Sequence, residues 1–117
     1  MKKDDNLTFE ELKTIVQQFI DERDWHKHHN PKNLAMSISI ESAELMELFQ
    51  WLTLEESIAL KNNKAKFEHI KEEVADIIIY CLSLGNVLDI DLSQAVLEKI
   101  EKNKSKYPTS KYNGNFE

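Results

Sequence analysis

The chain has 117 residues, a formal net charge of −6 at pH 7 and one cysteine, which suffices for one domain with one modest core. An acidic chain lacks the basic face of a duplex nucleic-acid binder, and no apolar run reaches the roughly 18 residues of a membrane-spanning helix. A lone Cys81 excludes an intramolecular disulfide, and the charged start, Met1-Lys2-Lys3, lacks the apolar stretch of a signal peptide. We therefore expect a cytoplasmic protein that binds neither membranes nor duplex nucleic acid.

The first predicted helix begins after Thr8. The run Thr8 to Glu11 has the pattern of a capping box, in which the threonine and glutamate side chains satisfy the free backbone groups of a helix start. Apolar residues then recur at helical spacing, so we expect this helix to run to about Trp25. A polar, histidine-rich link, His26 to Asn30, follows it.

The second and third predicted helices also have clear start signals. Asn30-Pro31 combines an N-cap with proline at the first helical position, and the helix it opens should run to about Leu52. The run Thr53 to Glu56 repeats the capping-box pattern and predicts a short third helix. Asn62-Asn63 should end that helix.

Two further helices complete an all-α prediction. The fourth should span about residues 66–87, and Asp91 with Gln94 should cap a fifth that ends near Pro108. No segment alternates apolar and polar residues as a strand would, so no sheet is expected. We expect residues 1–117 to form one domain, with a core over about residues 8–108 and a loose C-terminal tail.

Four carboxylates lie on apolar helix faces, where a solvated residue is unexpected. At about 100° per residue, Glu41 and Glu44 of the second helix project from the stripe that contains its leucines and isoleucines. Glu73 and Asp76 do the same on the fourth helix. A buried lone carboxylate costs several kcal/mol unless it is protonated or finds a partner. Two such pairs therefore predict a site for a hard cation, with pairing to lysines across helices as the main alternative.

The ligand types favour magnesium or manganese. All-oxygen ligation suits these ions, and no glutamate has a histidine three residues later, the spacing of carboxylate-bridged di-iron bundles. A zinc site would need histidines or several cysteines. His26, His28 and His29 offer a weaker alternative of that kind in the polar link.

The paired motifs Glu41-x-x-Glu44 and Glu73-x-x-Asp76 resemble the split metal signature of the all-α nucleoside triphosphate pyrophosphatases, which include MazG and the dCTP pyrophosphatases. The resemblance covers about residues 9–108. Three further stretches are similar to the dCTP pyrophosphatase branch: Glu22-Arg23-Asp24-Trp25 with His29-x-Pro31-x-Asn33-Leu34, then Glu44-Leu45-x-Glu47-Leu48-Phe49-Gln50-Trp51, and Lys99-x-x-x-Asn103-x-x-Lys106-Tyr107-Pro108.

This resemblance implies a MazG-like helical bundle whose four-helix core is completed by dimerisation, as a homodimer or homotetramer. It implies Mg²⁺-dependent hydrolysis between the α- and β-phosphates of a nucleoside triphosphate, with Mn²⁺ as a substitute and dCTP or a modified dCTP as the favoured substrate. The four carboxylates would be the metal-binding and catalytic residues. The substrate-binding candidates are Trp25, His29, Trp51, Tyr80, Lys99, Asn103 and Lys106.

The substrate-binding candidates also have plain structural interpretations. Trp25 and Trp51 end their predicted helices, where an aromatic ring can stack on a base or pack in the core or an interface. Lys99, Asn103 and Lys106 share one helix face, which suits phosphate but is also typical of a solvated face. Two non-enzymatic alternatives follow for the whole chain: a helical dimerisation module and a metal-binding regulatory protein.

Overall fold

The computed structural model describes residues 1–114 and is all-helical over that range, with no strand, which confirms the predicted fold class. The α-helices are α1 (Phe9–Glu22), α2 (Pro31–Glu47), α3 (Leu54–Ala59), α4 (Lys64–Leu88) and α5 (Leu92–Lys106). Short 3-10 turns η1 (Asp4–Asn6), η2 (His26–His28) and η3 (Leu60–Asn62) occupy the connections. None of the described helices is both long and apolar enough to cross a membrane.

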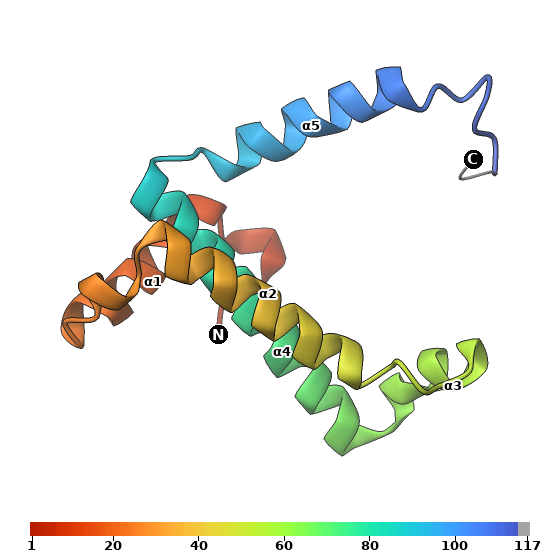
Figure 1. The fold of residues 1–117 in the computed structure, drawn as a ribbon, viewed down its shortest axis with the longest axis horizontal. Coiled ribbons are helices and arrows are strands. Elements are labelled where there is room, and N and C mark those ends of the chain that lie inside the picture. The colour runs from red at the N-terminus through yellow and green to blue at the C-terminus, as the bar shows by residue number, and fades with distance from the viewer. Residues whose placement is uncertain (115–117) are drawn as a thin grey trace.

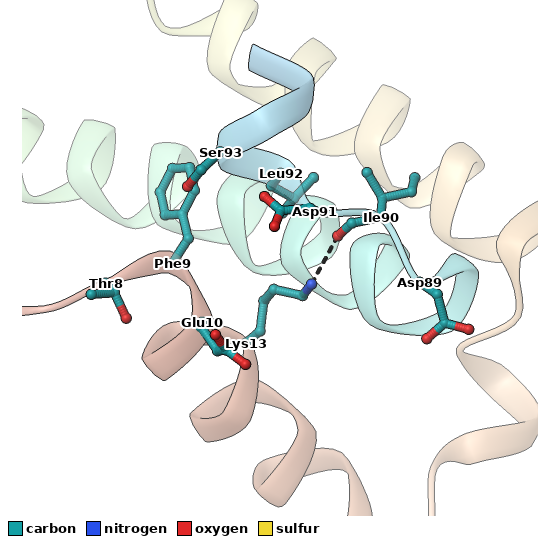
Figure 2. A pocket seen from close by; sticks show the side chains of 9 residues that line it. All are labelled: Thr8, Phe9, Glu10, Lys13, Asp89, Ile90, Asp91, Leu92 and Ser93. Carbon is teal, nitrogen blue, oxygen red and sulfur yellow. Dashed lines mark hydrogen bonds between the residues drawn. The ribbon is translucent and has the colours of Figure 1, made fainter. Parts of the chain in front are cut away.

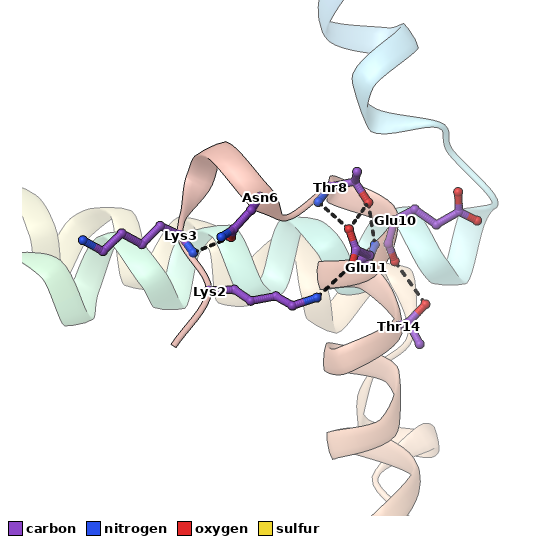
Figure 3. A network of polar contacts seen from close by, with 7 residues as sticks. All are labelled: Lys2, Lys3, Asn6, Thr8, Glu10, Glu11 and Thr14. Atoms are coloured by element: carbon purple, nitrogen blue, oxygen red, sulfur yellow. Dashed lines mark hydrogen bonds and ion pairs between the residues drawn. The ribbon is translucent and has the colours of Figure 1, made fainter.

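The predicted start of α1 is present in full. The hydroxyl of Thr8 accepts a hydrogen bond of 3.1 Å from the Glu11 amide, and the Glu11 carboxylate accepts one of 3.0 Å from the Thr8 amide (Figure 3). Thr53 and Glu56 form the same reciprocal pair before α3. Such side chains satisfy amides that have no partner inside the helix, which is why short polar motifs fix helix starts reliably.

The ends of the first two helices come earlier than expected. Helix α1 stops at Glu22, before Trp25, because Asp24 adopts a left-handed backbone with φ of 52°. Helix α2 stops at Glu47, and the chain then tightens: the Leu48 amide donates to the carbonyl of Leu45, three residues back, at 3.2 Å. Apolar periodicity continues through both ends, so the pattern alone overstates the helix lengths.

Helix α4 is the centre of the molecule. It runs antiparallel to α2, and the two lie side by side over most of their lengths, while α1 packs across the C-terminal half of α4 (Figure 1). The buried core at that crossing consists of Val16 and Ile20 from α1 and Leu82 from α4. This arrangement leaves the middle of the α2–α4 pair to carry polar side chains.

Helix α5 leaves this core as an arm that extends away from the other helices (Figure 1). The loop that leads into α5 is held by Lys13, whose amine donates a hydrogen bond of 2.8 Å to the Ile90 carbonyl (Figure 2). A cavity of about 470 Å³ lies beside this hydrogen bond. The Asn86 amide donates in turn to the carbonyl of Lys13 at 3.0 Å. A Cβ at Gly85 would lie 3.1 Å from the Leu92 side chain, so glycine at this position lets the first residue of α5 approach α4.

The predicted tail begins with a turn. The backbone amides of Lys111 and Tyr112 both donate to the carbonyl of Pro108 at 3.0 Å. The ring of Tyr112 packs edge-on against that of Tyr107, with centroids 5.1 Å apart. Residues 115–117 of the predicted tail lie outside the described residues.

Candidate metal and nucleotide site

Three of the four predicted carboxylates converge between α2 and α4. Glu41 of α2 and Glu73 and Asp76 of α4 each offer one oxygen, and these oxygens all lie within 4.8 Å of one another. Antiparallel packing brings this about, because the middle of α2 faces the middle of α4. The three residues, called the acidic trio below, form the single group of its kind within residues 1–114.

Glu44 stands at the edge of the acidic trio. It is exposed and does not belong to the tight group, but it is close enough to raise the pKa of the Glu41 carboxyl. The single chain thus forms a pincer from one glutamate of α2 and two acids of α4. Glu44 lies beside this pincer, near Glu41.

The acidic trio is electrostatically strained without a cation. The pKa of Glu41 rises from its ordinary 4.5 to about 7, first because its carboxyl meets that of Glu73, then because of burial and the neighbouring Glu44. One oxygen each of Glu41 and Glu73, Oε2 in both, is buried without a hydrogen-bond partner. Buried unpartnered oxygens of like charge are costly, and a divalent cation would satisfy both of them.

The alternative of lysine pairing is not what the structure shows. Within the described part of the chain, no lysine or arginine lies in ion-pair distance of Glu41, Glu44, Glu73 or Asp76. The basic group that does reach the acidic trio is His69, whose Nε2 lies 3.3 Å from Oε1 of Glu73. Sequence reasoning missed His69, because it tested for histidines after glutamates and this one precedes Glu73 by four residues.

A stack of rings continues from the acidic trio toward the N-terminus of α2. The rings of Trp25 and His29 are nearly parallel, at 6°, with centroids 6.2 Å apart, and His29 stacks in turn on Tyr80 at 6.4 Å. Tyr80 lies one turn of α4 beyond Asp76, so the stack and the carboxylates occupy neighbouring positions on one helix face. A cavity of about 310 Å³ lies beside His29 and is also lined by the buried Ser83.

The histidines of the link do not assemble a metal site in residues 1–114. Nε2 of His26 contacts the Asp21 carboxylate at 3.1 Å, and Nδ1 of His29 lies 3.1 Å from the Trp25 carbonyl. The described ligand groups that come together are carboxylates only. The zinc alternative therefore has no geometric support.

Comparisons with known proteins identify the family of the chain. Residues 36–116 match the MazG-like family. The chain belongs to the MazG-like family. In the search of solved structures it is similar to a pyrophosphatase from Archaeoglobus fulgidus DSM 4304, with 50% identity and a TM-score of 0.75 over 85% of this chain and 91% of that one.

Two curated relatives confirm the resemblance to the dCTP pyrophosphatase branch. The MazG-like chain is 38% identical over 101 residues to dCTP pyrophosphatase 1 of Bos taurus, and 36% identical over 101 residues to dCTP pyrophosphatase 1 of Homo sapiens. These matches cover 86% of this chain and 60% and 59% of the two relatives. The chain thus spans about 60% of the length of the bovine relative.

The remaining predicted substrate residues do not join the acidic trio within this MazG-like chain. Trp51 is 87% exposed and follows the C-terminal end of α2, a helix of 17 residues and thus about 25 Å long, whereas Trp25 and His29 precede its start. Lys99, Asn103 and Lys106 lie on the extended α5 arm (Figure 1). Within one chain, Trp51 therefore cannot reach the stack of rings formed by Trp25, His29 and Tyr80.

Proposed function

We propose that this MazG-like protein is a Mg²⁺-dependent pyrophosphatase that hydrolyses a deoxynucleoside triphosphate, dCTP or a modified dCTP, to the monophosphate and pyrophosphate. Such an activity removes aberrant or surplus nucleotides. The observation that carries the proposal is the acidic trio, with its buried unpartnered oxygens, one helical turn from a stack of rings. The relatives named dCTP pyrophosphatase 1 support the choice of substrate.

The donor set fits a hard divalent cation. Glu41, Glu73 and Asp76 supply oxygen ligands only, and Glu44 lies beside them. Mg²⁺ held there would neutralise phosphate charge and help to generate the attacking nucleophile. Glu41, Glu73 and Asp76 would hold the cation, and one of these carboxylates would accept the proton that leaves the attacking water. Mn²⁺ has the same ligand preference and should substitute.

The ring stack gives the base a place next to this cation. A pyrimidine can lie against His29, Trp25 or Tyr80, since any base offers a π-face to an aromatic ring. Stacking alone discriminates little between bases. A preference for cytosine requires a polar group that pairs with the base edge, and His29 lines the adjacent cavity.

A second copy of the chain completes the site in this proposal. The radius of gyration is 17.2 Å, against about 13.4 Å for a compact domain of this length. The accessible surface is 9555 Å², about 3,000 Å² more than a folded monomer of this mass exposes. Two chains would together have an excess of about 6,000 Å², at the upper end of the total area that obligate dimers bury. We propose a homodimer or homotetramer in which the partner's α5 and Trp51 approach the acidic trio.

Apolar surfaces mark where the second copy would pack. A groove of about 430 Å³ between α1 and α4 is lined by Leu12, Ile15, Val16, Phe19, Ala75, Ile78, Ile79 and Leu82. On the arm, Val96, Leu97 and Ile100 are 50%, 64% and 44% exposed. Contiguous apolar surface of this extent is typical of an interface.

Pyrophosphate release from dCTP, dTTP, dUTP, dATP and dGTP, with Mg²⁺ and with EDTA, tests the function. We expect no release in EDTA, recovery with Mg²⁺ or Mn²⁺, and kcat/KM highest for dCTP or a 5-substituted dCTP by about tenfold, or 1.4 kcal/mol. Full activity without metal would contradict the metal site. A clear preference for a purine would contradict the cytosine assignment and leave the hydrolytic chemistry in place.

A further inference from the structure

The Glu73 carboxylate has two unlike oxygens. Oε1 lies 3.3 Å from Nε2 of His69, one turn earlier on α4, at a position where the His69 side chain is 54% exposed and that of Glu73 is 11% exposed. Oε2 is buried and has no hydrogen-bond partner. One oxygen therefore meets an imidazole at the surface, and the other is left for a ligand inside the site.

We propose that His69 is a positioning residue for the metal site: its imidazole retains Oε1 of Glu73 at the surface, so that Oε2 stays available to the cation. The inference rests on the proposed function, since it concerns the same acidic trio. It adds a residue that touches neither the metal nor the substrate but decides which oxygen of Glu73 binds.

The physical reason is the repulsion inside the acidic trio. The three carboxylates offer oxygens within 4.8 Å of one another, so without a cation like charges are crowded there, and the flexible Glu73 side chain can relieve this by turning toward solvent. A neutral imidazole with its proton on Nε2 is a donor directed at Oε1, and it opposes that turn without any change of charge. Partners of this kind typically change metal affinity by about 10- to 100-fold.

A direct ligand role for His69 fits the geometry less well. The trio's oxygens lie within 4.8 Å of one another, and no nitrogen of His69 joins that group. Its Nε2 faces the outer oxygen of Glu73 instead. A glutamine at position 69 tests the difference, because its amide N–H can replace the donor, whereas an alanine cannot.

The experiment measures Mn²⁺ binding to the full chain, without nucleotide, by electron paramagnetic resonance. We expect His69→Ala to raise the Kd for Mn²⁺ by about tenfold, and His69→Gln to stay within about threefold of wild type because the donor is retained. His28→Ala is the matched control: it makes the same truncation at an exposed histidine of the link and should leave the Kd unchanged. Wild-type affinity in His69→Ala, or equal losses in His69→Ala and His69→Gln, would overturn the inference.

A further variant separates this inference from the proposed function. If Glu73→Gln binds Mn²⁺ like wild type, or if the wild type binds none, the metal site itself is wrong, and so is the role of His69. If Glu73→Gln loses Mn²⁺ while His69→Ala keeps it, only the role of His69 is wrong. Saturating Mg²⁺ should also restore the kcat of His69→Ala, since positioning affects how tightly the cation binds and not the chemistry it supports.

Discussion

Helices α4 and α5 are both amphipathic, but α4 packs along its length inside the chain, whereas α5 packs only near its first residue, Leu92. Helix α4 contacts α1 and α2 and buries Glu73, Leu82, Ser83 and Gly85. Helix α5 buries no residue at all. One chain therefore builds the carboxylate half of the proposed site, whereas the lysine-bearing half lies on α5, which packs against the core only near its first residue, Leu92.

This division has a consequence for the proposed enzyme. The acidic trio can attract a cation in a single chain, but Lys99, Asn103 and Lys106 can contact a polyphosphate at a metal site only where another copy brings its arm.

Glu73→Gln removes the charge of the most buried carboxylate that α4 contributes to the proposed metal site. We expect the activity to fall by on the order of a hundredfold or more, because a neutral amide is a poor ligand for Mg²⁺ and the transition-state charge loses its cation. Glu72→Gln, the same change at the exposed neighbouring residue, should keep wild-type turnover. Steady-state assays and circular dichroism measure both; normal turnover in Glu73→Gln with helicity intact would exclude Glu73 from the site.

Leu97→Asp places a charge on the apolar face of the α5 arm. We expect it to weaken assembly by about thirtyfold, since a desolvated charge in an interface costs at least about 2 kcal/mol. Light scattering should then show the wild type at a multiple of 13.7 kDa and the variant shifted toward a single chain. Activity should fall in parallel, because the arm no longer reaches the partner's site.

Ser105→Asp is the control for the arm. At about 100° per residue it lies about 140° from Ile100 and about 80° from Leu97, off the centre of the apolar face, so it should leave assembly unchanged. A wild-type protein that is monomeric and fully active at 13.7 kDa would show that α5 needs no partner.

Trp51→Ala removes the exposed ring that follows α2. Stacking on a base acts about equally in the ground state and the transition state, so KM should rise by about fivefold or more while kcat changes less. Trp51→Phe keeps an aromatic face and should recover most of the affinity. A fall in kcat at constant KM would instead place Trp51 at the reacting phosphates.

The smallest effect concerns pH and the metal-free acidic trio. The pKa of Glu41 is about 7 in the folded chain and near 4.5 when its neighbours are absent, so its contribution to stability is full below pH 4.5 and is lost as the pH rises through 7. In EDTA at pH 8 we expect Glu41→Gln to melt a few degrees above wild type, with little difference at pH 5. Mg²⁺ at pH 8 should raise the Tm of the wild type more than that of the variant. Equal Tm values of both proteins at both pH values would contradict the shift.

The order and the starts of the helices could be predicted from the sequence, and so could the candidate carboxylates. Capping boxes at Thr8 and Thr53 fixed helix starts because they act within four residues, and acids on apolar stripes predicted a ligand site because burial of lone charges is costly. The two early helix ends were not predictable from periodicity. They depend on the left-handed backbone conformation of Asp24 and on the tightened turns after Glu47, and no capping residue in the sequence indicates either.

Which of these residues meet depends on how the helices pack. Packing brought Glu41, Glu73 and Asp76 together, left Glu44 at their edge, and stacked His29 between Trp25 and Tyr80. Helix turns and helix packing also set three further features: the position of Trp51, the direction of the α5 arm, and the contact of His69 with Glu73. Spacing along one helix defines a face, but the distance between faces of different helices is set by packing.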